Sequence, residues 1–155
     1  MQTYKESIAN VIVDPFRREI LLLQRDNIEG KRDPLEWEFV AGKKETHENI
    51  ELTLFRETYE ETGIMLCKEN KNYKFIKKII NEQMGFYVDV YITFINKKDI
   101  DIRISKEHRD YLWVELKELT GTEKEFAFGI FNEFAKKILK TSYIVNIQIN
   151  DTLLL

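Results

Sequence analysis

Hydrophobic and polar residues follow two periodicities along the chain, and each predicts a different kind of element. Alternation every second residue, or a short apolar run between turn residues, indicates a strand. Such segments occupy residues 7–13, 19–24, 36–40, 73–82, 86–96, 100–104, 111–114 and 143–149. Apolar residues that recur every third or fourth position predict amphipathic helices over 48–61 and 123–140. Gly63 suits the end of the first helix, and 27–34 is predicted to be a loop.

The order of these elements predicts the fold class. The chain is rich in strands, has one helix in the middle and one near its end, and lacks a regular strand–helix–strand alternation. This order favours an α+β fold with a mixed sheet. Because no repeat or linker is visible, we expect one domain over residues 1–155, with 142–155 as an extra strand or tail. The strand pattern at 143–149 can extend the sheet of its own chain or that of a partner, so a homodimer is a further hypothesis.

Composition and charge argue against several classes of protein. A chain of 155 residues, 43% of them hydrophobic and 33% charged, can bury a core without covalent cross-links. Cys67 is the single cysteine, which excludes an intrachain disulfide framework. No apolar run approaches the ~20 residues of a membrane span, and the first residues lack the apolar core of a signal peptide, so we expect a cytoplasmic protein without a membrane partner. A net charge of −3 gives no reason to expect nucleic acid as a partner.

Three glutamates on one face of the first predicted helix carry the strongest chemical signal. Glu57, Glu60 and Glu61 are three and four residues apart, and like charges at this spacing destabilise an isolated helix. A solvated acidic face is the ordinary alternative, but Mg²⁺ compensates such a cluster and keeps positions for substrate phosphates. Residues 42–63 hold six glutamates and three basic residues, which equals the net excess of the whole chain. The acidity is therefore better read as a cation site than as a surface that repels nucleotides.

The spacing around these glutamates resembles the Nudix box, G-x5-E-x7-R-E-U-x-E-E-x-G-U, in which U is apolar. The matching positions are Gly42, Glu48, Arg56, Glu57, Glu60, Glu61, Gly63 and Ile64. Thr58 departs from the pattern at an apolar position, and Val-Ala-Gly at 40–42 replaces a common Pro-Gly-Gly. The W-x-x-V-x-G pattern at 37–42 resembles dihydroneopterin triphosphate and dATP pyrophosphohydrolases, and the segment from Glu107 is similar to dinucleoside polyphosphate hydrolases. The resemblance spans most of residues 5–140.

Membership of the Nudix family would imply an α/β/α sandwich and a hydrolase that needs Mg²⁺ or Mn²⁺. Its reaction is attack by water at a phosphorus of a nucleoside diphosphate linked to another group. The implied metal ligands are the backbone carbonyl of Ala41 and the carboxylates of Glu48, Glu57, Glu60 and Glu61. Glu60 is either a ligand or the general base, and Glu107 is a candidate ligand or base from the late loop. Arg56 resembles the arginine that orients the glutamates, which completes the implied catalytic set.

Cations near the box are candidates for contact with substrate. Arg25 ends a predicted strand where many relatives place a phosphate-binding cation, and a surface cation is the alternative reading. Lys43 and His47 flank the predicted metal loop and are candidate substrate contacts. His108, next to Glu107, is predicted to pack or to form a hydrogen bond at the start of a strand.

The substrate we expect is a small nucleotide, and the two resemblances favour a nucleoside or pterin triphosphate. Dinucleoside polyphosphates and the 5′ ends of RNA remain alternatives within the same chemistry, because substrate choice lies in loops rather than in the fold. A regulatory module that binds a nucleotide without turnover is an alternative of another class. The intact pair of box motifs, Arg56-Glu57 and Glu60-Glu61, argues against it.

Overall fold

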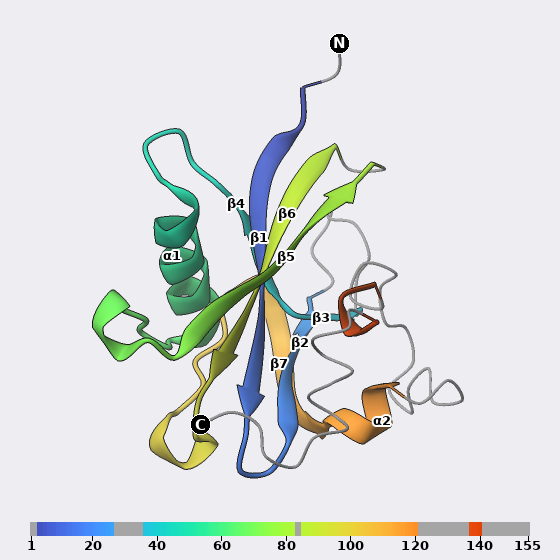
Figure 1. Ribbon diagram of the computed structural model, residues 1–155. Coiled ribbons are helices and arrows are strands. Elements are labelled where there is room, and N and C mark those ends of the chain that lie inside the picture. Colours follow the sequence, from blue (N-terminus) through green and yellow to red (C-terminus); the bar gives the residue numbers. More distant parts are fainter. Residues whose placement is uncertain (1–2, 27–35, 83–84, 121–136, 141–155) are drawn as a thin grey trace.

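A computed structural model describes residues 3–26, 36–82, 85–120 and 137–140. These residues form a seven-stranded mixed sheet and one long helix (Figure 1). In chain order the elements are β1 (Lys5–Asp14), β2 (Glu19–Arg25), β3 (Trp37–Glu38), β4 (Val40–Lys43), α1 (Ile50–Thr62), the 3₁₀ turn η1 (Lys68–Asn70), β5 (Tyr73–Asn81), β6 (Phe86–Phe94), the 3₁₀ turn η2 (Lys97–Asp99), β7 (His108–Glu115) and α2 (Leu116–Thr120).

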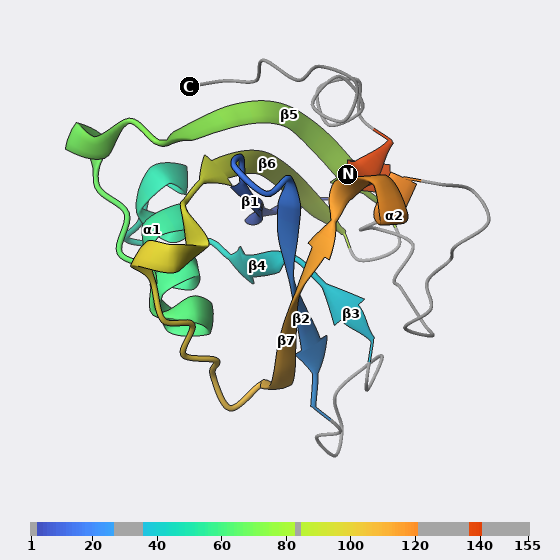
Figure 2. The same ribbon diagram turned by 90° about the horizontal axis from the view of Figure 1, so that it is seen from below.

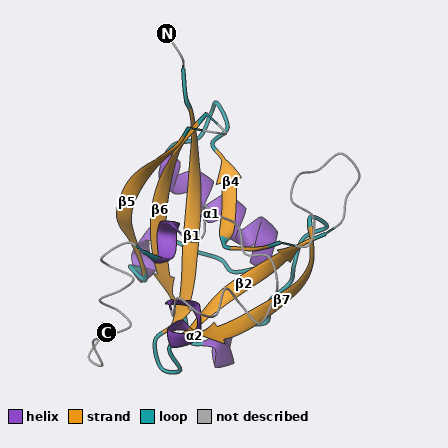
Figure 3. Ribbon diagram, turned by 90° about the vertical axis from the view of Figure 1, so that its right-hand side faces the viewer, coloured by secondary structure: helices purple, strands orange, loops and turns teal. Residues whose placement is uncertain are grey.

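The sheet forks along β1, and this fork determines where the polar loops meet. β1 runs parallel to β6 over its length, whereas every other pairing is antiparallel. β2 pairs with β1 only at Val13 and Asp14. Beside the earlier residues of β1, Ser7 to Asn10, the neighbouring strand is β4. The remainder of β2 leaves β1 and pairs with β3 and β7 (Figure 3). Only Phe39 separates β3 from β4, so the chain crosses from one branch to the other just before it enters the loop that leads to α1.

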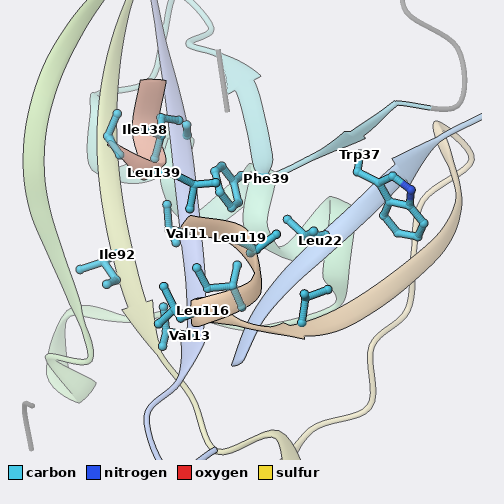
Figure 4. Close-up of a cluster of buried hydrophobic side chains, with 14 of the residues drawn as sticks. Val11, Val13, Leu22, Trp37, Phe39, Ile92, Leu116, Leu119, Ile138 and Leu139 are labelled. Carbon is cyan, nitrogen blue, oxygen red and sulfur yellow. The ribbon is translucent and has the colours of Figure 1, made fainter. Parts of the chain in front are cut away.

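Different elements cover the two faces of the sheet. Ile8 and Ile12 of β1 pack on one face with Leu54 of α1. The alternate residues of β1 pack on the other face in a cluster with α2 and with Ile138 and Leu139 (Figures 2 and 4). This arrangement confirms the expected α+β fold with a mixed sheet between helical layers. Of the second predicted helix, over 123–140, residues 123–136 lie outside the described residues, as does the predicted strand at 143–149.

Helix α1 begins and ends at residues whose side chain or backbone caps it. Asn49 precedes the helix, and its Oδ1 accepts a hydrogen bond of 2.8 Å from the backbone N–H of Leu52. Gly63 follows the helix in the left-handed region, with φ of 80°, and its N–H bonds to the carbonyl of Tyr59. The helix therefore starts two residues later than predicted, and its predicted glycine stop is confirmed.

Two strand predictions were wrong in part. The segment predicted as a strand at 36–40 divides into β3 and the start of β4 at Phe39. Residues 100–104 are not a strand. Their alternation arises because Ile100, Ile102 and Ile104 pack against the cluster beneath α1, while the N–H of Arg103 bonds to the carbonyl of Thr62.

A buried polar network explains why a threonine stands at an apolar position of the box. Thr58 is fully buried, and its hydroxyl oxygen accepts a 3.0 Å hydrogen bond from the side-chain amide of Asn10 in β1. The amide oxygen of Asn10 accepts in turn from the hydroxyl of Thr93 in β6, at 2.7 Å. The network therefore ties α1 to both parallel strands at the centre of the sheet.

Replacement of Thr58 by valine should destabilise the protein because it leaves the buried amide of Asn10 without an acceptor. We expect the free energy of unfolding to fall by about 1–3 kcal/mol, the usual cost of a buried polar group that loses its partner. Urea denaturation followed by circular dichroism measures this change. Thr46→Val, at an exposed position, is the matched control and should change little. Equal stability of Thr58→Val and the wild type would contradict this role of the network.

Candidate active site

The box glutamates reach the fork of the sheet through a close contact between α1 and β4. Gly42 of β4 faces Glu57, and a Cβ atom at position 42 would overlap the carboxyl group of Glu57. The requirement for glycine is one of space, since Gly42 does not have a positive φ. The backbone N–H of the preceding residue, Ala41, donates a 3.2 Å hydrogen bond to Oε1 of Glu61. Both carboxylates are thus held against β4.

Arg56 is the hub that orders the acidic side chains. Its Nε and Nη2 contact the two oxygens of Glu48 at 2.6 and 2.9 Å. Its Nη1 donates to Glu57 at 2.8 Å and to Glu60 at 3.2 Å. Nη2 also donates to the backbone carbonyl of Lys43, which attaches the helix to the end of β4. The guanidinium fork suits such multiple contacts with carboxylates.

Glu48 serves this hub and the loop before the helix. Its Oε1 also accepts hydrogen bonds from the N–H of Glu45 and the hydroxyl of Thr53, both at 3.0 Å. The hydrogen bond from Arg56, helped by these donors, lowers the pKa of Glu48 from its ordinary 4.5 to about 2. Glu48 is therefore an ionised side chain with both oxygens engaged, and it supports Arg56.

Glu57 and Glu61 have the opposite electrostatic character. Burial raises the pKa of Glu61 well above 4.5, and the charges of Glu38 and Glu57 raise it further. Burial also raises the pKa of Glu57, against the lowering effect of Arg56, and the charges of Glu60 and Glu107 add to the rise. The raised pKa values mean that nearby positive charge does not fully offset the repulsion and burial of these two carboxylates. A hard divalent cation fits this set, because it accepts carboxylate oxygens and removes their repulsion.

The structure gathers most of the predicted catalytic side chains. Glu107, in the exposed turn before β7, is close enough to raise the pKa values of both Glu57 and Glu61. Glu60 lies further out, with 53% of its side chain exposed, and contacts Arg56.

The predicted substrate contacts are more dispersed. The ammonium of Lys43 stands 5.1 Å from the ring centroid of Phe86, and the side chain of His47 is 76% exposed. Arg25 is held by Glu38, with 3.2 Å between Nη1 and Oε2. His47 also belongs to a group in which ligand atoms of Glu45, His47 and Glu48 lie within 4.8 Å of one another. Two members of this group are exposed and the third is bonded to Arg56. The group is therefore a poorer candidate for binding a cation than Glu57 and Glu61 are.

Sequence reasoning missed Glu38. This residue of β3 lies close enough to Glu61 to raise its pKa, and its carboxylate contacts Arg25 and His108. The available signal was an acidic residue between the aromatic residues Trp37 and Phe39 in a strand that leads into the box. The predicted role of His108 agrees with the structure, since it is buried at the first residue of β7 and bonded to Glu38.

Comparisons with known proteins agree with this geometry. The family model described as "NUDIX domain" matches residues 3–134. An 8-oxo-dGTP diphosphatase from Buchnera aphidicola subsp. Acyrthosiphon pisum (strain APS) is 34% identical over 116 residues, which cover 75% of this chain and 86% of that protein. Within the described residues, no helix has the length and apolar character to span a membrane.

Solved structures show the same fold. The MutT protein from Methanosarcina mazei Go1 is 26% identical with a TM-score of 0.61, over 82% of this chain and 88% of that one. The dihydroneopterin triphosphate pyrophosphohydrolase of E. coli gives a TM-score of 0.69 at 19% identity, over 93% and 99% of the two chains. A MutT/nudix family protein from Enterococcus faecalis gives 0.60 at 19% identity over 73% of this chain, which spans 44% of that longer one.

A family model over most of the chain and a relative above 30% identity together confirm the resemblance of the box. The chain belongs to the Nudix hydrolase superfamily, as a MutT-like pyrophosphohydrolase.

Proposed function

We propose that this protein hydrolyses a phosphoanhydride bond of a nucleoside triphosphate and depends on Mg²⁺ or Mn²⁺. The observation that carries the proposal is a pair of carboxylates, the buried Glu61 and the half-buried Glu57, whose pKa values are raised at the junction of β4 and α1. Such perturbed groups mark functional sites. The 34% sequence identity to an 8-oxo-dGTP diphosphatase supports a nucleoside triphosphate as substrate. The likeness to the dihydroneopterin triphosphate pyrophosphohydrolase, at 19% identity, supports only the fold.

Glu57, Glu61 and the backbone carbonyl of Ala41 are the proposed metal ligands, with Glu60 and Glu107 at the edge of the set. The bound cation would supply Lewis-acid polarisation of a phosphate oxygen and charge neutralisation. Arg56 keeps the carboxylate of Glu57 in place, because its Nη1 bonds to Oε1 of Glu57 while its other nitrogens are fixed by Glu48 and Lys43. Arg25, Lys43 and His47 remain the proposed contacts of the substrate phosphates.

The general base is the second role that we propose. Glu60 is half exposed and bonded to Arg56, and Glu107 is exposed and adds to the charge felt by both buried carboxylates. We therefore assign the proton-accepting role to Glu107, because its charge acts on both carboxylates and it is not one of the ion-pair partners of Arg56 in the described chain. Glu60 is the alternative base.

Purified protein should release a nucleoside monophosphate or diphosphate from a triphosphate, and the reaction should stop when EDTA removes the metal. The panel to assay is 8-oxo-dGTP, the ordinary nucleoside triphosphates, dihydroneopterin triphosphate, a dinucleoside polyphosphate and triphosphorylated RNA, each with Mg²⁺ and with Mn²⁺. Glu61→Gln should lower kcat at least about a hundredfold, while Glu115→Gln on β7 is the control. Absence of turnover with every substrate would favour the alternative of a regulatory module that binds a nucleotide without hydrolysing it.

A comparison of Glu107→Gln with Glu60→Gln tests the assignment of the base. Loss of a general base costs about 10²- to 10⁴-fold in kcat, and we expect this loss at Glu107. Glu60→Gln should cost clearly less, because it removes one of several contacts of Arg56. Steady-state kinetics across pH 6–9 provide both numbers. The reverse order of the two effects would transfer the role to Glu60.

The pKa shifts predict how metal-free protein responds to pH. Glu57 and Glu61 have raised pKa values, so their contribution to stability is complete below the ordinary value of 4.5 and is lost as the pH rises through the raised values. Glu48 acts in the opposite sense, since its contribution is present above 4.5 and is lost as the pH falls through about 2. The contribution of these three groups is therefore greatest in weak acid.

Urea denaturation with EDTA should accordingly show lower stability at pH 7 than at pH 5. At pH 7, Mg²⁺ at a hundred times its dissociation constant should add about 2.7 kcal/mol to the free energy of unfolding. Glu61→Gln should raise the stability of the metal-free protein at pH 7 and reduce the gain from Mg²⁺. A wild-type protein whose stability is the same with and without Mg²⁺ would contradict the proposed ligands.

A further inference from the structure

We propose that Glu38 is a positioning residue, which is anchored by the buried His108 and which directs the guanidinium of Arg25 toward the phosphates of the substrate. The inference deepens the proposed function and rests on it, because it takes Arg25 as a phosphate contact. It adds a role for two residues that lie outside the box, one in β3 and one in β7.

The carboxylate of Glu38 is shared between two partners. Its Oε1 lies 2.9 Å from Nε2 of His108 and 3.3 Å from Nη1 of Arg25, and its Oε2 lies 3.2 Å from the same Nη1. The side chain of Glu38 is 16% exposed and that of His108 is 1% exposed, while that of Arg25 remains 30% exposed. His108 and Glu38 are therefore fixed inside the protein, whereas the guanidinium of Arg25 reaches solvent.

His108 is itself fixed on its other side. Its Nδ1 lies 3.3 Å from the hydroxyl of Ser105, and that hydroxyl also accepts from the backbone N–H of Glu107 at 3.3 Å. With the ring proton on Nε2, His108 donates to Glu38 and accepts at Nδ1 from the serine, so every hydrogen-bonding atom is used. The backbone adds a further link, because the N–H of Asp26 bonds to the carbonyl of Glu107. The ends of β2 and β7 are thus held together.

The same carboxylate lies near Glu61, one of the two proposed glutamate ligands. Glu38 is the first charged neighbour that raises the pKa of Glu61, so Arg25 is held on the side of the fork where the proposed metal ligands meet. Arg25 follows an irregularity in the pairing of β2 with β7, between Gln24 and Arg25. Such an irregularity redirects a side chain, and it frees this guanidinium to approach Glu38. A pre-oriented guanidinium binds phosphate without the cost of ordering a long side chain.

The variant Glu38→Gln separates positioning from folding. Its amide oxygen still accepts from Nε2 of His108, whereas its NH₂ group takes the place of Oε2 and cannot accept from Nη1 of Arg25. The variant therefore keeps the anchor but loses the negative charge and the shorter of the two contacts that hold Arg25. Arg25→Gln removes the guanidinium itself. If Glu38 acts through Arg25, the double variant is no worse than Arg25→Gln alone, whereas independent effects would multiply. Glu115→Gln, on β7, is the matched control, since the carboxylate of Glu115 forms an ion pair with Lys117 at the surface.

Two readouts are needed. The first is KM and kcat for the best triphosphate of the panel at saturating Mg²⁺, and the second is the affinity for Mg²⁺-pyrophosphate by isothermal titration calorimetry. We expect each single variant to raise KM and weaken pyrophosphate binding about 10- to 100-fold, the scale of one lost hydrogen bond to a charged group, with kcat within about threefold. The double variant should match Arg25→Gln, and Glu115→Gln should match the wild type.

Each other outcome has a definite meaning. Unchanged KM and affinity in Glu38→Gln, or effects of the two variants that multiply, would overturn the positioning role while the proposed function stands. If the wild type binds pyrophosphate but hydrolyses nothing, the proposed function fails. The pyrophosphate affinities of the two single variants and the double variant then decide the role of Glu38. If the wild type neither binds pyrophosphate nor hydrolyses a triphosphate, both proposals are overturned. A melting temperature for each variant shows whether it is folded, and Glu38→Asp, which keeps the charge but is one carbon shorter, replaces Glu38→Gln if the latter is not.

Discussion

The repulsion between a buried carboxylate, Glu61, and a half-buried one, Glu57, is the constraint on which the site depends. Glu57 and Glu61 are one helical turn apart and largely withdrawn from solvent. Glu60 acts on Glu57, Glu38 acts on Glu61, and the charge of Glu107 acts on both. Such an arrangement opposes folding, because burial of like charges costs free energy. The arrangement becomes favourable when a divalent cation supplies the missing positive charge. The cost of the metal-free state is therefore the physical basis of the proposed metal affinity.

The rest of the fold keeps this unfavourable cluster in place. The fork of the sheet brings β4 beside β1, and Gly42 leaves the space that the carboxyl group of Glu57 occupies. Arg56 neutralises part of the charge and ties the helix to the carbonyl of Lys43. The buried hydrogen bonds among Thr93, Asn10 and Thr58 join α1 to β6 and β1. These contacts oppose the movement by which the two carboxylates would otherwise separate.

The sequence predicted those features that rest on local spacing. The i+3 and i+4 positions of the box placed its glutamates on one helix face, and Gly63 ended the helix as expected. Alternation alone failed at residues 100–104, because a segment that packs under a helix has the same two-residue period as a strand. Thr58 looked like a mild departure from the family pattern, yet it is half of a buried hydrogen bond whose partner, Asn10, is 48 residues away.

Glu38 shows most clearly where sequence reasoning ends. Its partner in β7 is 70 residues distant, and no periodicity relates the two positions. The predicted helix over 123–140 and the strand at 143–149 fall largely or wholly outside the described residues, so both stay predictions. The structure brings the side chains of the box together, and their individual roles stay predictions.

Direct titration of the protein with Mn²⁺, followed by electron paramagnetic resonance, tests the central claim. The account predicts that the wild type removes free Mn²⁺ from solution, that Glu61→Gln binds it at least about tenfold more weakly because one ligand and one buried charge are gone, and that Glu115→Gln binds it normally. Equal binding by the wild type and Glu61→Gln, or no binding by the wild type, would contradict the claim that the buried carboxylate pair is a cation site.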